Sequence, residues 1–181
     1  MWQSPVIVTP PAVEPVTLDQ AKEFLRVDDA DDTFDTEIGL QLAGARNHIE
    51  SVTGTRLISQ VVDLRADSFE DLALIKAGPV ASIEEISYLD RDGAAQIIAA
   101  SDYELTGSGL ERGIRSAPLS RWPTASAAGG AITVRATLGY GEDGDAIPQA
   151  VRLAILLKLR ALFEDGSADI DHLLVNDRIW L

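Results

Sequence analysis

The sequence predicts an α+β protein in which two long helices pack across an inserted β-rich region. Apolar residues recur at helical spacing near residues 33–53 and again near residues 148–164. Between these segments, residues 57–138 form short runs rich in β-branched residues, which Gly, Pro and Asp interrupt. Helices before and after a block of strands are typical of an α+β architecture.

The first sixteen residues are expected to form an extended arm. Four prolines occur among the first fifteen residues, and proline fixes φ and removes a backbone donor. Thr17 and Gln20 then form a T-x-x-Q capping box, which predicts a short helix that ends near Arg26. Residues 17–56 are therefore expected to hold the N-terminal helices.

The second predicted helix covers residues 33–53 and ends at Gly54. Its apolar residues follow one another at steps of three and four, which places them on one face that needs a packing partner. These residues are Phe34, Ile38, Leu42, Ala45, Ile49 and Val52.

The β-rich region spans residues 57–139. Asp92-Gly93 is a plausible hairpin turn, and Gly78-Pro79 and Gly129-Gly130 mark other breaks between strands. The sequence does not predict the order in which these strands pair.

A core helix is predicted over residues 147–166, with Pro148 at its first position. Its apolar residues cover more than one stripe, so we expect it to pack both on its own core and on another element or subunit. The remaining residues, 167–181, form a short tail.

Composition and charge exclude several functions. The 181 residues are 46% hydrophobic and 24% charged, as in a folded globular protein, and we expect one domain. The net charge of -14 disfavours sequence-specific binding to DNA. The absence of cysteine excludes disulfides, thiolate zinc sites and a cysteine nucleophile. No apolar run reaches the roughly 18 residues of a spanning helix, so we expect no membrane contact and a cytoplasmic product.

Catalysis is not expected either. His48 lies within a helix and His172 lies in the tail, and neither has a serine-rich elbow nearby. No phosphate-binding glycine motif is present. We therefore predict a protein that is not an enzyme and that needs no cofactor and no metal.

Acidic residues concentrate near the N-terminus. Residues 1–37 contain nine acidic and two basic residues, which is half of the net charge. Asp28, Asp29, Asp31 and Asp32 lie close together, but a calcium loop would also need a central glycine, which is missing here. A solvated acidic face and a functional one both remain open. The basic residues of the core helix offer an opposite patch, which head-to-tail neighbours in a ring would use.

The tail carries two apolar clusters that a chain terminus would ordinarily expose to water. One consists of Leu173, Leu174 and Val175, and the other of Ile179, Trp180 and Leu181. Two interpretations remain open: the tail folds back on its own core, or it docks on another subunit or protein.

Several motifs together resemble the head-tail connector (adaptor) proteins of tailed phages. The N-terminal stretch has a Pro-Val-Thr-Leu box at residues 15–18, a helix that ends in Leu-Arg-Val, an acidic break and a long helix closed by Thr-Gly. Leu57-Ile58-Ser59-Gln60 then matches the entry into the family's strands. Later, Leu138-Gly139-Tyr140-Gly141, an acidic loop, Ile147-Pro148 and the apolar helix resemble the family's C-terminal half. The resemblance covers nearly the whole chain and departs from the family at residues 166–181.

This resemblance implies a single head-tail connector domain, found in phages, prophages and phage-derived gene transfer agents. The implied fold is mainly a helical bundle with an inserted β-rich region and an extended C-terminal tail. The implied role is that of a structural virion protein at the head-tail neck, cytoplasmic before assembly. Such adaptors bind the portal as a ring, expected to be a dodecamer, extend the channel for double-stranded DNA, and carry the stopper or tail-completion protein.

The resemblance also suggests where the contacts lie. We expect the tail to bind the portal through His172, Leu173, Leu174, Val175, Ile179, Trp180 and Leu181. We expect the subunit core and the ring contacts to use Phe34, Ile38, Leu42, Ile49, Val151, Ile155, Leu156 and Leu159. Asp28, Asp29, Asp31 and Asp32 are expected to face the channel, where like charge lets DNA slide without sticking.

Two other classes of function stay open. A monomeric protein-binding module would use the β-rich region for recognition and would have no affinity for a portal. A hydrolase would need a pocket with paired carboxylates, which the sequence alone does not reveal.

Overall fold

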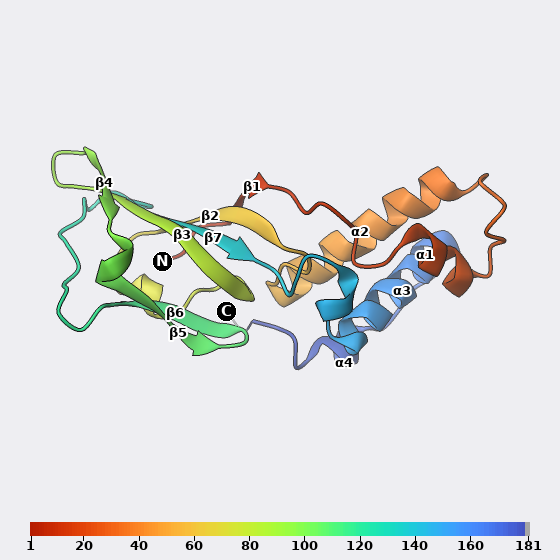
Figure 1. The fold of residues 1–181 in the computed structure, drawn as a ribbon. Helices are drawn as coiled ribbons and strands as arrows, with labels where there is room; N and C mark the ends of the chain where they lie inside the picture. The colour runs from red at the N-terminus through yellow and green to blue at the C-terminus, as the bar shows by residue number, and fades with distance from the viewer. Residues whose placement is uncertain (180–181) are drawn as a thin grey trace. The chain divides into compact units, whose positions relative to one another are not determined.

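The computed structural model describes residues 1–179, which form two compact units (Figure 1). The first comprises residues 1–10 and 60–139 and is called the β unit below. The second comprises residues 11–59 and 140–179 and is called the helical unit. Each unit is therefore built from two stretches of chain that are distant in sequence.

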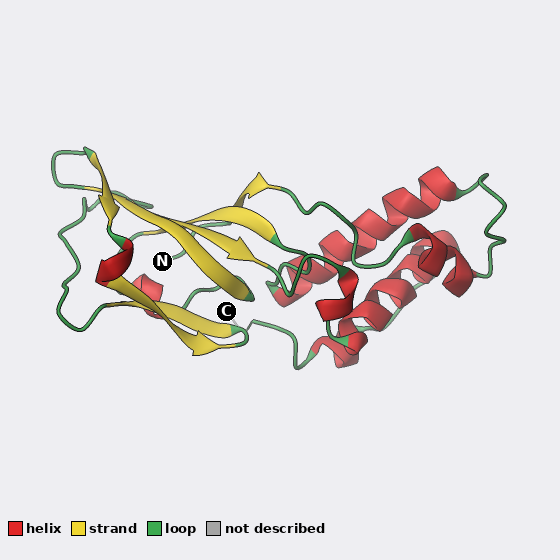
Figure 2. Cartoon of the chain, in the orientation of Figure 1, coloured by secondary structure: helices red, strands yellow, loops and turns green. Residues whose placement is uncertain are grey.

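The β unit contains a five-stranded antiparallel sheet (Figure 2). In spatial order its strands are β1 (Val6–Thr9), β2 (Gln60–Ala66), β7 (Ile132–Leu138), β3 (Val80–Leu89) and β4 (Ala95–Ile98). Because β7 lies between β2 and β3, the centre of the sheet joins strands from both ends of the β-rich region. The proline-rich arm supplies the edge strand β1, where a missing ladder donor is tolerated.

A hairpin and two short 3-10 helices complete the β unit. Strands β5 (Tyr103–Ser108) and β6 (Glu111–Ser116) form a separate two-stranded sheet, and the 3-10 helices are η1 (Asp71–Ala73) and η2 (Ala100–Asp102). The predicted turn at Asp92-Gly93 is confirmed: it joins β3 to β4, and Gly93 has a φ of 80°. Gly113 on β6 lies against the backbone of η1, so a side chain at this position would collide with the carbonyl of Ala73.

The core of the β unit follows from the alternation of its strands. Along β2 and β7 every second residue is buried, as a strand with one face on a core requires. The antiparallel register pairs Val62 with Ala136 and Leu64 with Val134, and all four are at most 2% exposed. These pairs form the centre of an apolar cluster that Phe69, Leu72 and Ile114 complete.

The helical unit contains the predicted helices with small shifts at their ends. They are α1 (Leu18–Leu25), α2 (Asp35–Thr53) and α3 (Gln149–Phe163), with a 3-10 turn η3 (Gly144–Ala146) before α3. A further short helix that was not predicted, α4 (Asp171–Leu174), lies in the tail. The capping box of Thr17 and Gln20 is formed as predicted, and Gly54 ends α2 with a φ of 71°. Pro148 caps α3 and is not its first helical residue.

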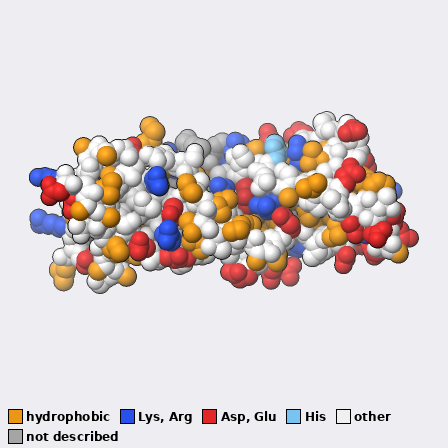
Figure 3. All heavy atoms as spheres, turned by 90° about the horizontal axis from the view of Figure 1, so that it is seen from above, with side chains coloured by type: hydrophobic (Ala, Val, Ile, Leu, Met, Phe, Trp, Pro, Cys, Tyr) orange, Lys and Arg blue, Asp and Glu red, His pale blue; other side chains and the backbone are white. Residues whose placement is uncertain are grey.

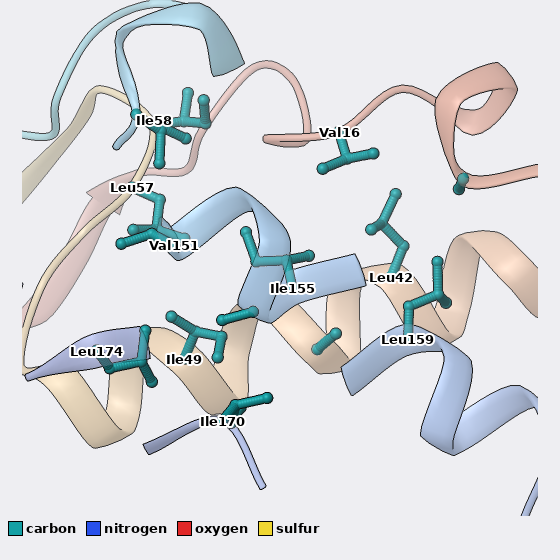
Figure 4. Packing of buried hydrophobic residues seen from close by; sticks show 14 of the residues in the cluster. Val16, Leu42, Ile49, Leu57, Ile58, Val151, Ile155, Leu159, Ile170 and Leu174 are labelled. Atoms are coloured by element: carbon teal, nitrogen blue, oxygen red, sulfur yellow. The ribbon is translucent and has the colours of Figure 1, made fainter. Parts of the chain in front are cut away.

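The core of the helical unit lies between α2, α3 and the tail (Figure 4). Leu42 and Ile49 of α2 belong to the same buried cluster as Ile155 and Leu159 of α3. Figure 4 shows these side chains directed into the space between the two helices. Ile170 and Leu174, which follow α3, close the cluster, so the tail contributes to this core.

The expectation of a mainly helical bundle is wrong. Within residues 1–179 the chain forms four α-helices, of which α1 has 8 residues and α4 has 4, beside a five-stranded and a two-stranded sheet. The reason is that the period-two alternation in residues 60–138 buries a separate apolar cluster, comparable to that of the helices. The region is inserted between the two stretches of the helical unit, as predicted, but it forms a unit with its own core. Nor is the tail extended, because Ile170 and Leu174 are buried and Ile179 donates its backbone N–H to Thr53.

Candidate functional site

The acidic residues expected to face a channel lie in the loop between α1 and α2. Asp28, Asp29 and Asp32 are exposed and Asp31 is half-buried. Local bonds shape the loop: the Asp28 carboxylate accepts the N–H of Ala30 at 2.9 Å, and that of Asp31 accepts the N–H of Thr33 at 3.0 Å. Figure 3 shows acidic side chains gathered at the end of the helical unit.

A buried lysine holds this loop against α1. Lys22 is 3% exposed, and its Nζ lies 2.7 Å from Asp35 Oδ1 and 3.1 Å from the carbonyl oxygen of Asp29. The hydrogen bond to Asp35 raises the pKa of Lys22, with the charges of Asp29 and Asp31 adding to the effect. Hydrogen bonds from Thr33 lower the pKa of Asp31. The loop therefore presents fixed negative charge at neutral pH.

A groove runs between α1 and α3 on the helical unit, with a volume of about 580 Å³. Its apolar lining is Val16, Phe24, Leu153 and Leu156, and its polar lining is Gln20, Glu23, Arg26, Gln149 and Arg152. Leu153 is 41% exposed, which makes the groove a surface feature rather than a closed cavity.

Two arginines on α3 bind α1 along this groove. The Arg160 guanidinium donates to the carbonyl of Phe24 at 2.7 Å and lies 4.0 Å from the centre of its ring. Arg152 lies 3.4 Å from Asp145 and 3.4 Å from Gln20. The walls of the groove are thus held at a defined separation.

The residues expected in the core and in ring contacts separate into two groups. Six are at most 2% exposed, namely Ile38, Leu42, Ile49, Val151, Ile155 and Leu159. Phe34 is 38% exposed and meets Phe163 edge-on at 5.8 Å, and Leu156 is half-buried in the groove. Only Phe34 and Leu156 thus keep surface that a neighbouring subunit would reach.

The tail residues expected to bind a portal divide in the same way. Leu174 is 1% exposed and Ile179 is 9% exposed, so both already pack within the chain. Leu173 is half-buried, whereas His172 and Val175 are exposed. The remaining two expected contacts, Trp180 and Leu181, lie outside the described residues.

Leu40 is one of the exposed apolar residues that sequence reasoning did not single out. It lies on the outer face of α2 and is 72% exposed. The signal was its phase, because Leu40 falls between Ile38 and Leu42 and therefore outside the buried stripe.

The two units also hold ionic networks. In the helical unit Glu50 is 6% exposed; it accepts the N–H of Leu57 at 2.9 Å and lies 3.4 Å from Arg46. Burial raises the pKa of Glu50. In the β unit the Arg135 guanidinium donates to both oxygens of Asp63 at 2.8 and 2.9 Å, which lowers the pKa of that carboxyl.

Two kinds of feature are missing from the described part of the chain. Residues 1–179 contain no cluster of three or more His, Asp or Glu side chains placed to hold a metal ion. None of the helices in this range is both long and apolar enough to cross a membrane.

Three solved structures share the fold of this chain. A chain from the "Neck of empty GTA particle computed with C6 symmetry" is 20% identical with a TM-score of 0.82, over 99% of this chain and 97% of that one. A chain from the "Virion of native gene transfer agent (GTA) particle" is 22% identical with a TM-score of 0.80, over 99% and 97%. A third, from the "Neck of native GTA particle computed with C12 symmetry", is 22% identical with a TM-score of 0.72, over 97% and 96%.

At these identities the likeness establishes the fold, which the chain shares over nearly its full length with components of gene transfer agent particles. No protein-family model and no curated protein sequence matches the chain.

Proposed function

We propose that this chain is a structural protein of a virion neck, in a gene transfer agent or a related tailed phage. The observation that carries the proposal is the full-length match of the fold to chains from GTA necks and a GTA virion, at TM-scores of 0.72–0.82. Coverage of 96–97% of those chains means that the likeness extends to the whole of each neighbour rather than to a common motif. The role is structural and involves no catalysis.

More specifically, we propose that the chain is the adaptor, a single connector domain that binds the portal as a ring. The resemblance of its motifs to head-tail connectors supports this role, as do the C6 and C12 symmetries of the particles that contain its structural neighbours. Twelve copies fit both symmetries. In this role the ring extends the DNA channel and carries the stopper or tail-completion protein.

The surfaces described above have distinct tasks in this proposal. The exposed tail residues His172 and Val175, with half-buried Leu173, contact the portal, whereas Leu174 and Ile179 hold the tail on its own unit. The acidic loop at residues 28–32 faces the channel, where fixed negative charge repels the phosphate backbone and prevents adhesion.

The proposal is tested by the light-scattering mass of the full chain, alone and mixed with the portal protein of the same particle. We expect a ring-sized complex, either alone or only with the portal. A chain that stays monomeric and ignores the portal would favour the monomeric protein-binding module instead. Val175→Asp is expected to weaken the complex with the portal, whereas Ser167→Asp, at another exposed position of the same unit, is the matched control.

A further inference from the structure

We propose that neighbouring copies in the ring contact each other through α2 and the groove, with Leu40 of one copy seated between α1 and α3 of the next. The inference rests on the proposed ring and names the two surfaces that build it. Both surfaces belong to the helical unit of each copy.

The groove has the properties of a receptor for an apolar side chain. Leu153 and Leu156 of α3 and Phe24 of α1 line it, and none of the three is buried. Its volume of about 580 Å³ exceeds that of one leucine side chain, so flanking residues of the partner helix enter as well. Because Arg160 and Arg152 bind α1 from α3, the groove is already formed before a partner arrives.

The outer face of α2 has the complementary shape. Leu40 projects from it at 72% exposure. Gly39 and Gly44 flank it, and no atom lies within 4 Å of the position that a Cβ would take at either glycine. Because the two glycines have no side chains, the backbone of a second chain can come close to α2 on either side of Leu40. A helix that packs into a groove needs such a close approach.

Charge identifies the occupant as a second copy of this chain. The rim of the groove carries the guanidinium groups of Arg26 and Arg152 and the carboxylate of Glu23. Glu37 lies three residues before Leu40, so it extends from the same face of α2 and approaches this rim when Leu40 enters the groove. Arg152 already lies 3.4 Å from Asp145, which leaves Arg26 as the rim cation for Glu37. An exposed leucine with a neighbouring carboxylate therefore matches an apolar floor with an arginine on its rim.

The geometry also explains why the contact makes a ring rather than a dimer. Ile38 and Leu42 lie on the inner face of α2, which packs in the core shared with α3. Leu40 lies between them in the sequence and therefore points away from that core. The groove lies on the other two helices, α1 and α3. Two different surfaces of one subunit give a heterologous contact, which repeats from copy to copy until the ring closes.

Cross-linking of the full chain tests this contact, because the natural sequence has no cysteine. The variant Leu40→Cys/Leu153→Cys is assembled into rings, whose mass is checked, and treated with a short bis-maleimide. We expect a ladder of covalent multimers on a denaturing gel. The matched control, Leu40→Cys/Ser167→Cys, keeps the α2 site but moves the second cysteine to an exposed position outside the groove.

Each outcome decides between the alternatives. A ladder for the first pair that exceeds the control at least tenfold supports the contact. Rings of correct mass without such a ladder overturn the contact but leave the proposed function intact. Efficient cross-linking of the single variant Leu40→Cys into dimers has the same consequence, because it would indicate an isologous contact between two α2 helices. A chain that stays monomeric both alone and with the portal overturns the proposed ring together with this contact.

Discussion

The two units differ in the side chains that they expose and in how those side chains are bonded. The polar face of the sheet is bonded within itself: Arg135 pairs with Asp63, and Thr137 donates to Glu84 at 2.8 Å. Exposed apolar residues of the β unit lie on the edge strands, as Val6 does on β1 and Ile97 on β4, and in loops, as Leu119 does. The helical unit instead combines an apolar groove, an exposed leucine on a helix and a loop of mostly exposed acidic side chains. The comparison supports the proposal that the helical unit carries the contacts between copies.

The strongest test of this comparison separates the two cores. Leu159→Ala removes a fully buried side chain of the helical unit and is expected to lower its free energy of unfolding by about 3 kcal/mol. Hydrogen exchange should accelerate in α2 and α3 and less in β2 and β7. The matched variant Leu138→Ala, in the core of the β unit, should produce the reverse pattern. Equal acceleration in both units by both variants would show that the cores are not distinct.

Leu156→Asp and Leu159→Asp compare a groove residue of α3 with a core residue of the same helix. Leu156 is half-buried in the groove, so its substitution is expected to reduce stability by only about 1–2 kcal/mol and to abolish ring formation. Circular dichroism checks the fold and light scattering checks the mass. Leu159→Asp, three residues further along the same helix, should prevent folding instead. Normal rings from Leu156→Asp would argue against a contact in the groove.

The buried carboxylate of the helical unit is expected to have an unfavourable effect at neutral pH. Because the pKa of Glu50 is raised above its value of about 4.3 in the unfolded chain, its ionised form destabilises the fold once the pH exceeds the folded pKa. Glu50→Gln keeps an acceptor for Leu57 and should therefore stabilise the chain by about 1 kcal/mol at pH 7. Denaturant titration should show this gain shrinking as the pH falls through the raised pKa of folded Glu50, and absent below about 4.3. A loss of stability at pH 7 would mean that the ion pair with Arg46 outweighs the cost of burial.

The ion pair of the β unit should show the opposite dependence on pH, with a smaller effect. The pKa of Asp63 is lowered below its unfolded value of about 3.9, so its contribution is fully present above that pH and is lost as the pH falls through the folded pKa. Arg135 is 43% exposed, so Asp63→Asn should cost only about 0.5 kcal/mol at pH 7. The difference from the natural chain should vanish in the same titration once the pH lies below the lowered pKa of folded Asp63. A difference that persists there would assign the effect to packing.

Much of the local structure could be predicted from the sequence. The capping box at Thr17, the αL stop at Gly54 and the hairpin turn at Asp92-Gly93 depend on residues that are neighbours in the chain. The buried stripe of α2 is also local, because helical spacing alone places Ile38 and Leu42 on one face. These features need no information about distant segments.

The candidate surfaces could be predicted only in part. The acidic loop and the apolar tail were visible as runs of residues, but the burial of Leu174 and Ile179 depends on where the tail returns to α2. The groove was hidden because its walls come from α1 and α3, more than a hundred residues apart. The expected helical bundle was wrong because the inserted β region buries an apolar core of its own, comparable to that of the helices.

By itself the sequence determined the three longer helices, the acidic character of residues 1–37 and the exclusion of cysteine chemistry, because each follows from local spacing or from composition. Only the tertiary structure decided that β7 pairs between β2 and β3, that the sheet has its own core, and that the tail completes the helical one. The physical reason is that strand pairing and burial depend on contacts between residues far apart in the chain, which propensity and periodicity do not encode.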